Sequence, residues 1–138
     1  MRVVRAESGS DPAPRLFRVA VHVSDVALAV RCYETLLRVP PVRVGDGRWY
    51  FHCAGAILVC VDPETEGHGA DPGPNTGRLY FAVDELDAYA ARAVEAGCTI
   101  TNGPELQDWG ERSFYGRDPF GNPFCFVEAA TAYTGASG

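Results

Sequence analysis

The sequence contains two halves that follow the same order of patterns, the second starting 60 residues after the first. In each half, apolar residues alternate with polar or small ones up to a triplet suited to capping a helix. These triplets are Val23-Ser24-Asp25 and Val83-Asp84-Glu85. A helical pattern and short strand patterns follow each triplet, so each half is predicted to be a βαβββ module. Neither module can cover both faces of its own sheet, so the two must pair.

The predicted fold is therefore α+β, built from paired βαβββ modules within one domain of residues 16–128. The first module spans 16–62 and the second spans 77–128, and the segment 63–76 between them has the Gly and Pro content of a linker. Residues 1–15 are predicted to be a mobile N-terminal tail and residues 129–138 a C-terminal tail.

Local signals place the helices and strands within each module. Asp25 is predicted to cap a helix that ends before Pro40, and Asp84 to cap a second helix that stops at Gly97. Besides the strand that opens each module and the last strand of the second, we expect strands near residues 42–44, 49–53, 56–61, 98–101 and 111–117.

The last strand pair is predicted to be a hairpin closed by Asp118-Pro119-Phe120-Gly121. Asp at the first position, Pro at the second and Gly at the fourth are typical of a type I turn. The Asp118 side chain is expected to accept hydrogen bonds from the amides of this turn.

This hairpin also carries a family resemblance. Trp109-Gly110, Arg117-Asp118-Pro119, Gly121-Asn122 and Phe126-Val127 resemble the last hairpin of the vicinal oxygen chelate superfamily, which includes glyoxalases, bleomycin resistance proteins and dioxygenases. The resemblance implies helices on the convex side of the sheets and a ligand cleft on the concave side. It also implies a homodimer, in which module exchange between subunits often completes the cleft.

Strand alternation sorts the side chains between the two faces of each sheet. The valine, leucine and phenylalanine positions of the opening strands are assigned to the helices, as are Phe124 and Phe126. The opposite positions are assigned to the cleft, with three further aromatic residues at its rim. The candidate ligand-binding residues are Arg18, His22, Arg78, Tyr80, Trp49, Trp109, Tyr115 and Cys125.

Metal-dependent members of the superfamily bind their ion through a His in the first strand of each module and a Glu in the last strand. The matching positions of this sequence are Arg18, Arg78 and Cys125. A guanidinium has no lone pair to donate, and a single thiol does not make a site, so no metal cofactor is expected. An improvised site from His22, His52 and an acidic residue is the alternative.

The two arginines and His22 have two interpretations each. The arginines could bind a carboxylate, phosphate or enolate, or they could form rim ion pairs with residues such as Glu111 or Glu128. His22 is the one candidate catalytic residue, as a general base; otherwise it is a core histidine with a hydrogen-bonded neighbour.

Composition restricts the partners. A net charge of −6 and a pI of about 4.9 do not suit a protein that binds the phosphate backbone of nucleic acid. No apolar run reaches the roughly 18 residues of a membrane span, and the first residues lack the apolar region of a signal peptide. We therefore expect a cytoplasmic protein, and we expect its five cysteines to be buried, reduced thiols.

The function predicted from these observations is metal-free binding of a small molecule, as in bleomycin resistance proteins, with a drug or metabolite sequestered in the cleft. The alternative is an enzyme of glyoxalase type, a lyase, isomerase or dioxygenase that uses an unanticipated metal or none. A domain that only dimerises is a third, weaker possibility.

Overall fold

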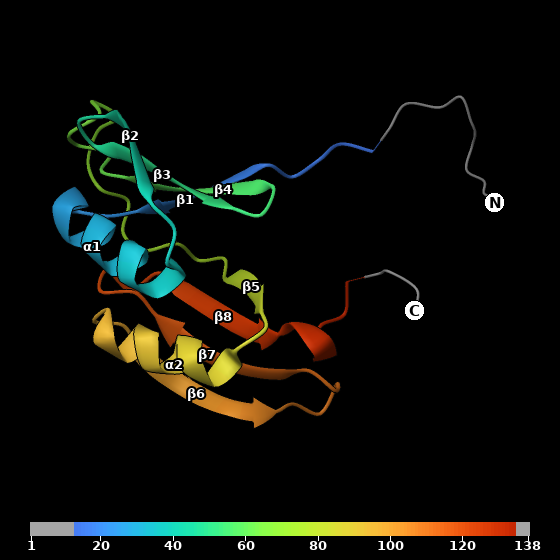
Figure 1. Cartoon of the computed structure of the whole chain (residues 1–138). Coiled ribbons are helices and arrows are strands. Elements are labelled where there is room, and N and C mark those ends of the chain that lie inside the picture. Colours follow the sequence, from blue (N-terminus) through green and yellow to red (C-terminus); the bar gives the residue numbers. More distant parts are fainter. Residues whose placement is uncertain (1–12, 135–138) are drawn as a thin grey trace.

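The computed structural model describes residues 13–134, and within them two βαβββ modules follow one another along the chain (Figure 1). Residues 1–12 and 135–138, which include most of the predicted N-terminal tail, lie outside the described residues. The first module consists of β1 (Arg18–His22), α1 (Val26–Leu37), β2 (Pro41–Gly45), β3 (Arg48–Cys53) and β4 (Ala56–Val61). The second consists of β5 (Leu79–Val83), α2 (Leu86–Glu95), β6 (Thr99–Leu106), β7 (Arg112–Arg117) and β8 (Pro123–Glu128).

The two sheets have the same topology. The strand order is β1-β4-β3-β2 in the first sheet and β5-β8-β7-β6 in the second. In each sheet the opening strand pairs in parallel with the last strand, while the remaining pairs are antiparallel. The opening strand lies at the edge because the helix that follows it carries the chain across to the next strand. The predicted α+β fold of paired βαβββ modules is confirmed.

The helices begin and end largely at the predicted signals. Asp25 is the N-cap of α1, and its Oδ1 accepts a 3.1 Å hydrogen bond from the backbone N of Leu28. The prediction for α2 was wrong by one residue, because its N-cap is Glu85, which makes no side-chain capping bond. Strand β6 is also longer than predicted, since its pairing with β7 continues past two irregularities to Leu106.

One side of each sheet forms the core with the helices. Phe51, Phe114 and Phe126 are 0% exposed, and the rings of Phe114 and Phe126 stack with centroids 5.2 Å apart. Tyr33 of α1 lies in the same cluster, tilted against Phe51 at 6.1 Å. Each such side chain stabilises the fold by about 1.5–3 kcal/mol through removal of apolar surface from water. A single core therefore spans both modules.

Hydrogen bonds of the buried side chains Asp118 and Asn122 join the two modules at the end of the second. Within the β7–β8 turn, Asp118 Oδ1 accepts from the backbone N of Phe120 (2.9 Å) and of Asn122 (2.8 Å), as the turn chemistry predicted. Asn122 Nδ2 donates to the carbonyl oxygen of His22 at 3.0 Å, and Asn122 Oδ1 accepts from the backbone N of Asn75 at 2.8 Å. The edge of β1 is thereby bonded to the turn and to the segment between the modules.

The segments outside the two modules are also attached to them. Glu66, in the linker 63–76, accepts hydrogen bonds from the backbone N of Gly47 (3.0 Å) and from Arg48 Nε (3.3 Å). After β8, the short 3-10 helix η1 (Ala129–Thr131) brings Thr131 Oγ1 to the backbone N of Arg112 at 2.9 Å. The part of the predicted C-terminal tail that is described therefore packs along β7.

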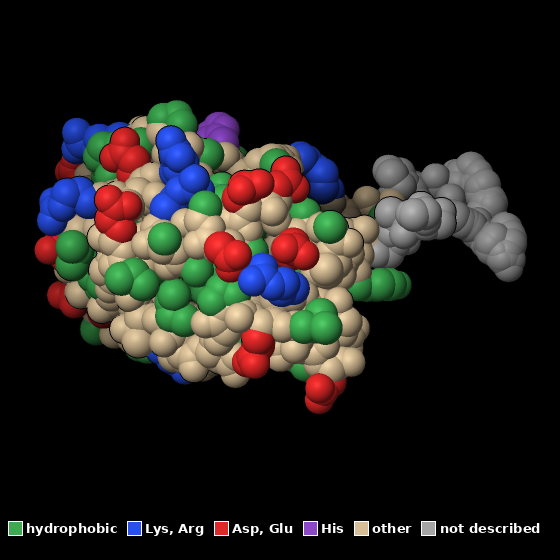
Figure 2. All heavy atoms as spheres, turned by 60° about the horizontal axis from the view of Figure 1, so that its bottom comes forward, with side chains coloured by type: hydrophobic (Ala, Val, Ile, Leu, Met, Phe, Trp, Pro, Cys, Tyr) green, Lys and Arg blue, Asp and Glu red, His purple; other side chains and the backbone are tan. Residues whose placement is uncertain are grey.

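The surface shown in Figure 2 has acidic and basic side chains interspersed, with hydrophobic side chains gathered between them. Within residues 13–134, no helix has the length and apolar character that crossing a membrane requires.

Candidate functional site

The sheet face opposite the helices is called the open face, and in the second module it brings four predicted site residues together. In the strand register, Tyr80 of β5 pairs with Cys125 of β8, and Cys125 pairs with Tyr115 of β7. These three side chains therefore lie in one row across the open face. Arg78 precedes β5 and places its guanidinium carbon 5.0 Å from the centre of the Tyr115 ring. The row combines a cation with two phenol rings, a chemistry suited to a planar ligand that carries oxygen atoms.

Two buried polar groups lie on this face, Cys125 within the row and Ser113 on the neighbouring rung. Cys125 and Ser113 are each 1% exposed, and Ser113 pairs with Val127, so it shares the open face with Cys125. Burial raises the pKa of the Cys125 thiol and outweighs the opposing effects of hydrogen bonding to Ser113 and Tyr115 and of the Arg78 charge, so the thiol stays protonated at neutral pH. This disfavours Cys125 as a nucleophile.

The Ser113 hydroxyl is unusual because it makes no hydrogen bond of good geometry within residues 13–134, although it lies close enough to Cys125 and Tyr115 to act against the rise in the pKa of both. A buried hydroxyl without a partner costs roughly 1–3 kcal/mol. Such a group is typical of a place where a ligand or water completes the bonding. The sequence analysis did not identify Ser113, although its alternation with Tyr115 along β7 was the signal that could have found it.

The rim of this face is organised by Glu111. Its Oε1 accepts from the indole Nε1 of Trp109 at 2.9 Å, and its Oε2 accepts from the backbone N of Tyr133 at 2.8 Å. The two aromatic side chains remain 63% and 87% exposed. Trp109 is therefore exposed and held by Glu111, its role at the rim of a ligand site stays a prediction, and Glu111 and Tyr133 were not predicted beside it.

The first module carries a similar pair. Arg18 Nη1 donates a 3.1 Å hydrogen bond to the hydroxyl of Tyr50, and its guanidinium carbon lies 5.7 Å from the Tyr50 ring centre. Tyr50 occupies the place in β3 that Tyr115 occupies in β7, two strands from the arginine-bearing strand. The internal repeat therefore includes an Arg–Tyr pair on each open face. In the first module the sequence analysis identified the arginine of this pair but not Tyr50.

The placement of Trp49 corrects the prediction. Trp49 pairs with Cys60, and it alternates along β3 with Tyr50 so that it shares the helix side of the sheet with Phe51. It therefore does not lie on the rim beside Arg18. The prediction relied on the size of the indole, whereas the alternation of β3 settles which side chain faces outward.

The histidines are divided between two places. His22 lines a hollow of about 340 Å³ together with Arg48 of β3 and His68 of the linker. His52 lies on the same open face, on the rung Arg18–Ile57–His52. Within residues 13–134, no group of three or more His, Cys, Asp or Glu side chains is placed to hold a metal ion.

The positions used by metal-dependent members of the resembling superfamily do not fit a metal here. The Arg18 and Arg78 guanidiniums are occupied with tyrosine rings, and both are hydrogen-bond donors with no lone pair to offer a cation. Cys125 is buried with a raised pKa, so the thiolate that a metal would require is disfavoured. These three residues favour an oxygen-rich or anionic ligand over a cation.

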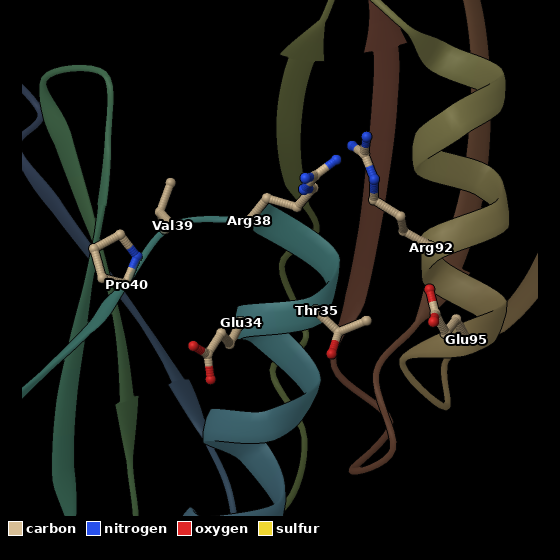
Figure 3. Close-up of a pocket in the computed structure, with 7 residues that line it drawn as sticks. All are labelled: Glu34, Thr35, Arg38, Val39, Pro40, Arg92 and Glu95. Atoms are coloured by element: carbon tan, nitrogen blue, oxygen red, sulfur yellow. The ribbon is translucent and has the colours of Figure 1, made fainter.

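Further hollows include one that is lined in part by Arg78 and Tyr80 of the row. A mostly apolar groove of about 590 Å³ runs between the modules, where Val19 of β1, Ile57 of β4 and Phe81 of β5 contribute to its lining. A shallower hollow of about 470 Å³ lies between α1 and α2, where Arg38 and Arg92 point toward one another (Figure 3). The latter contains none of the predicted site residues.

Comparisons with known proteins agree with this architecture. The family model described as "Glyoxalase/Bleomycin resistance protein/Dioxygenase superfamily" matches residues 15–126. Among solved structures, a glyoxalase/bleomycin resistance protein from Albidiferax ferrireducens is similar with a TM-score of 0.69 and 24% identity, over 80% of this chain and 95% of that one. A lactoylglutathione lyase from Agrobacterium tumefaciens gives a TM-score of 0.67 and 21% identity, over 86% and 96%.

A glyoxalase-related enzyme from Fulvimarina pelagi gives a TM-score of 0.72 and 18% identity, over 84% of this chain and 88% of that one. These identities establish a common fold. No curated protein sequence matches the chain significantly.

Proposed function

Because the chain belongs to the glyoxalase/bleomycin resistance protein/dioxygenase superfamily, we propose that it is a metal-free protein that binds a small molecule bearing a carboxylate or carbonyl oxygen. The binding surface is the open face of the second module, and the expected outcome of binding is sequestration in the cytoplasm, as in bleomycin resistance proteins. The observation that carries the proposal is the buried hydroxyl of Ser113, which makes no hydrogen bond of good geometry within residues 13–134, on the face that also presents Arg78 and Tyr115.

Each residue has a distinct role in this proposal. Arg78 provides a forked pair of donors for a carboxylate, and Tyr80 and Tyr115 offer ring faces to a planar group. Ser113 offers a donor to a second ligand oxygen from the neighbouring rung. Trp109 closes the rim, and Glu111 fixes its orientation. Arg18 and Tyr50 repeat the cation and the ring on the first module.

Calorimetry with benzoate and with benzylamine as paired probes tests the proposal. Benzoate should bind and benzylamine should not, because the two share a ring and differ in the sign of charge. Arg78→Ala should weaken benzoate binding by about 1.5–3 kcal/mol, the range for hydrogen bonds to a charged group. Ser113→Ala should also weaken binding while changing the free energy of unfolding little, because the hydroxyl makes no hydrogen bond of good geometry within residues 13–134.

The matched control is Arg43→Ala, which removes an exposed arginine of β2 that pairs with Asp46 and lies outside the row. It should leave benzoate binding unchanged. Equal weakening by Arg43→Ala and Arg78→Ala would show a general charge effect and refute the site.

We also propose a homodimer. β1 and β5 are edge strands, and apolar or aromatic side chains beside these edges are exposed, including Leu16 at 86% and Tyr80 at 64%. An exposed edge with apolar neighbours is suited to association with a second copy. Light scattering should report twice the 14.9 kDa chain mass, and Leu16→Asp should shift it toward the single chain. A single-chain mass for the unmodified protein would refute the dimer.

The alternative is an enzyme of glyoxalase type, a lyase, isomerase or dioxygenase that uses an unanticipated metal or none. The structural similarity to a lactoylglutathione lyase favours testing it, and His22 in its hollow with Arg48 is the candidate general base. Turnover of a hemithioacetal or a catechol, with and without added divalent metal, is the measurement. If the protein turns over either substrate and His22→Ala abolishes that turnover, the enzyme alternative is supported over the binding-protein proposal.

A further inference from the structure

Two cysteines of different modules meet in the core. Cys32 Sγ, in the middle of α1, lies 3.7 Å from Cys98 Sγ, which lies between α2 and β6. They are 2% and 9% exposed and 66 positions apart in the sequence. Within residues 13–134, no other pair of cysteine sulfurs is in hydrogen-bonding contact. This pair is therefore the one place where a covalent bond could link the modules with little rearrangement.

We propose that Cys32 and Cys98 form an oxidation site, at which hydrogen peroxide converts the two thiols into a disulfide that links the first module to the second. This proposal is independent of the small-molecule site, because neither cysteine lies on an open face.

The reaction balances with one peroxide. The sulfur of Cys98, the more exposed of the two, attacks one peroxide oxygen; the O–O bond breaks and one water leaves, giving a sulfenic acid. The sulfur of Cys32 then attacks the sulfur of Cys98; the S–O bond breaks and the second water leaves. Two electrons pass from the thiols to the peroxide, and both thiol protons end in water.

The geometry and the acidity of the pair set the conditions for this reaction. A disulfide has an S–S length of about 2.05 Å, so the two sulfurs, which lie 3.7 Å apart, must move closer before the bond can form. The hydrogen bond to Cys98, followed by burial, raises the pKa of Cys32, which keeps the Cys32 thiol protonated in the folded protein near neutral pH. Oxidation is therefore slow and responds to sustained peroxide.

The product should be more stable than the reduced protein. The bond closes a long loop of chain in the unfolded state and so reduces its conformational freedom. A link between α1 and the start of β6 also holds the two modules together if one of them opens. We expect the melting temperature of the oxidised protein to rise by roughly 10 °C.

The experiment treats the reduced, full-length protein with hydrogen peroxide and follows the intact mass, the thiol content in denaturant and the melting temperature. The expected result is a mass loss of two hydrogens, loss of two of the five thiols, and a proteolytic fragment in which the Cys32 and Cys98 peptides are cross-linked. All three should reverse with a small dithiol reductant.

Cys32→Ser and Cys98→Ser should each abolish the mass loss and the rise in melting temperature. Cys53→Ser, at a half-buried position on β3, is the matched control and should keep both. Retention of all five thiols, or a cross-link that maps to another pair, would overturn the proposal. Mapping the cross-linked peptides of the oxidised protein without substitutions tests the proposal even if a serine variant does not fold.

Discussion

The hydroxyl of Tyr33 donates a 2.7 Å hydrogen bond to Asp118 Oδ2 and so joins α1 of the first module to the last turn of the second. Tyr33 is 2% exposed and Asp118 is 4% exposed, so water does not compete for either group. The other oxygen of Asp118 accepts two amides of its own turn. One carboxylate therefore shapes a local turn and fixes the arrangement of the modules.

Tyr33→Phe should lower the free energy of unfolding by about 1.5–3 kcal/mol, the range for a hydrogen bond to a charged group. The ring and its contact with Phe51 are retained, so the loss reports the hydroxyl alone. Denaturant unfolding measures it. Tyr50→Phe, which removes a hydroxyl bonded in an exposed pair, is the control and should cost much less.

The same tyrosine should make the protein less stable at alkaline pH. Burial, followed by the neighbouring Asp118 carboxylate, raises the pKa of Tyr33 well above its ordinary value. Above about pH 10 the unfolded tyrosine loses its proton while the folded one keeps it, so stability falls as pH rises. The difference in unfolding free energy between the unmodified protein and Tyr33→Phe should therefore shrink above that pH. A constant difference from pH 7 to 11 would contradict this.

Asn122→Ala should destabilise the protein by about 2–4 kcal/mol, because it leaves buried groups of both modules without partners. The carbonyl oxygen of His22 and the backbone N of Asn75 each lose a hydrogen bond to this side chain. Thermal and denaturant unfolding should agree on the loss. Asn102→Ala on the exposed side of β6 should change stability by less than about 0.5 kcal/mol.

Gly116→Ala should destabilise the protein by about 1–3 kcal/mol through overpacking. A Cβ at this position of β7 would lie 2.7 Å from the carbonyl oxygen of Thr99 and 2.9 Å from a ring atom of Phe124. Because the oxygen belongs to the paired strand β6, it cannot move without disturbing the sheet. Gly77→Ala meets nothing within 4 Å and should leave the unfolding midpoint nearly unchanged.

Local patterns predicted the fold because each module repeats a strong alternation. The strand 56–61 was predicted with the bounds that the structure has, and the apolar and polar faces of β1 and β5 are those expected. The prediction placed Trp49 at the rim because it gave more weight to the size of the indole ring than to the alternation of side chains along β3.

The missing parts of the site depend on contacts that no local pattern encodes. Ser113 makes no hydrogen bond of good geometry within residues 13–134 because of what surrounds it in three dimensions, and Glu111 holds Tyr133 across 22 positions of sequence. The roles of the site residues in binding stay predictions, since the sequence places residues on a face but does not identify a ligand.

The hydrogen bonds that Asn122 and Asp118 make with the first module have a consequence for synthesis of the chain. The carbonyl oxygen of His22 accepts its hydrogen bond from Asn122, 100 positions later in the sequence. The hydroxyl of Tyr33 donates to Asp118, 85 positions later. A ribosome that has produced only the first module has therefore made a sheet whose edge and helix still lack their buried partners. The native junction forms only after residues 118–122 have emerged, and until then the first module lacks these hydrogen-bond partners.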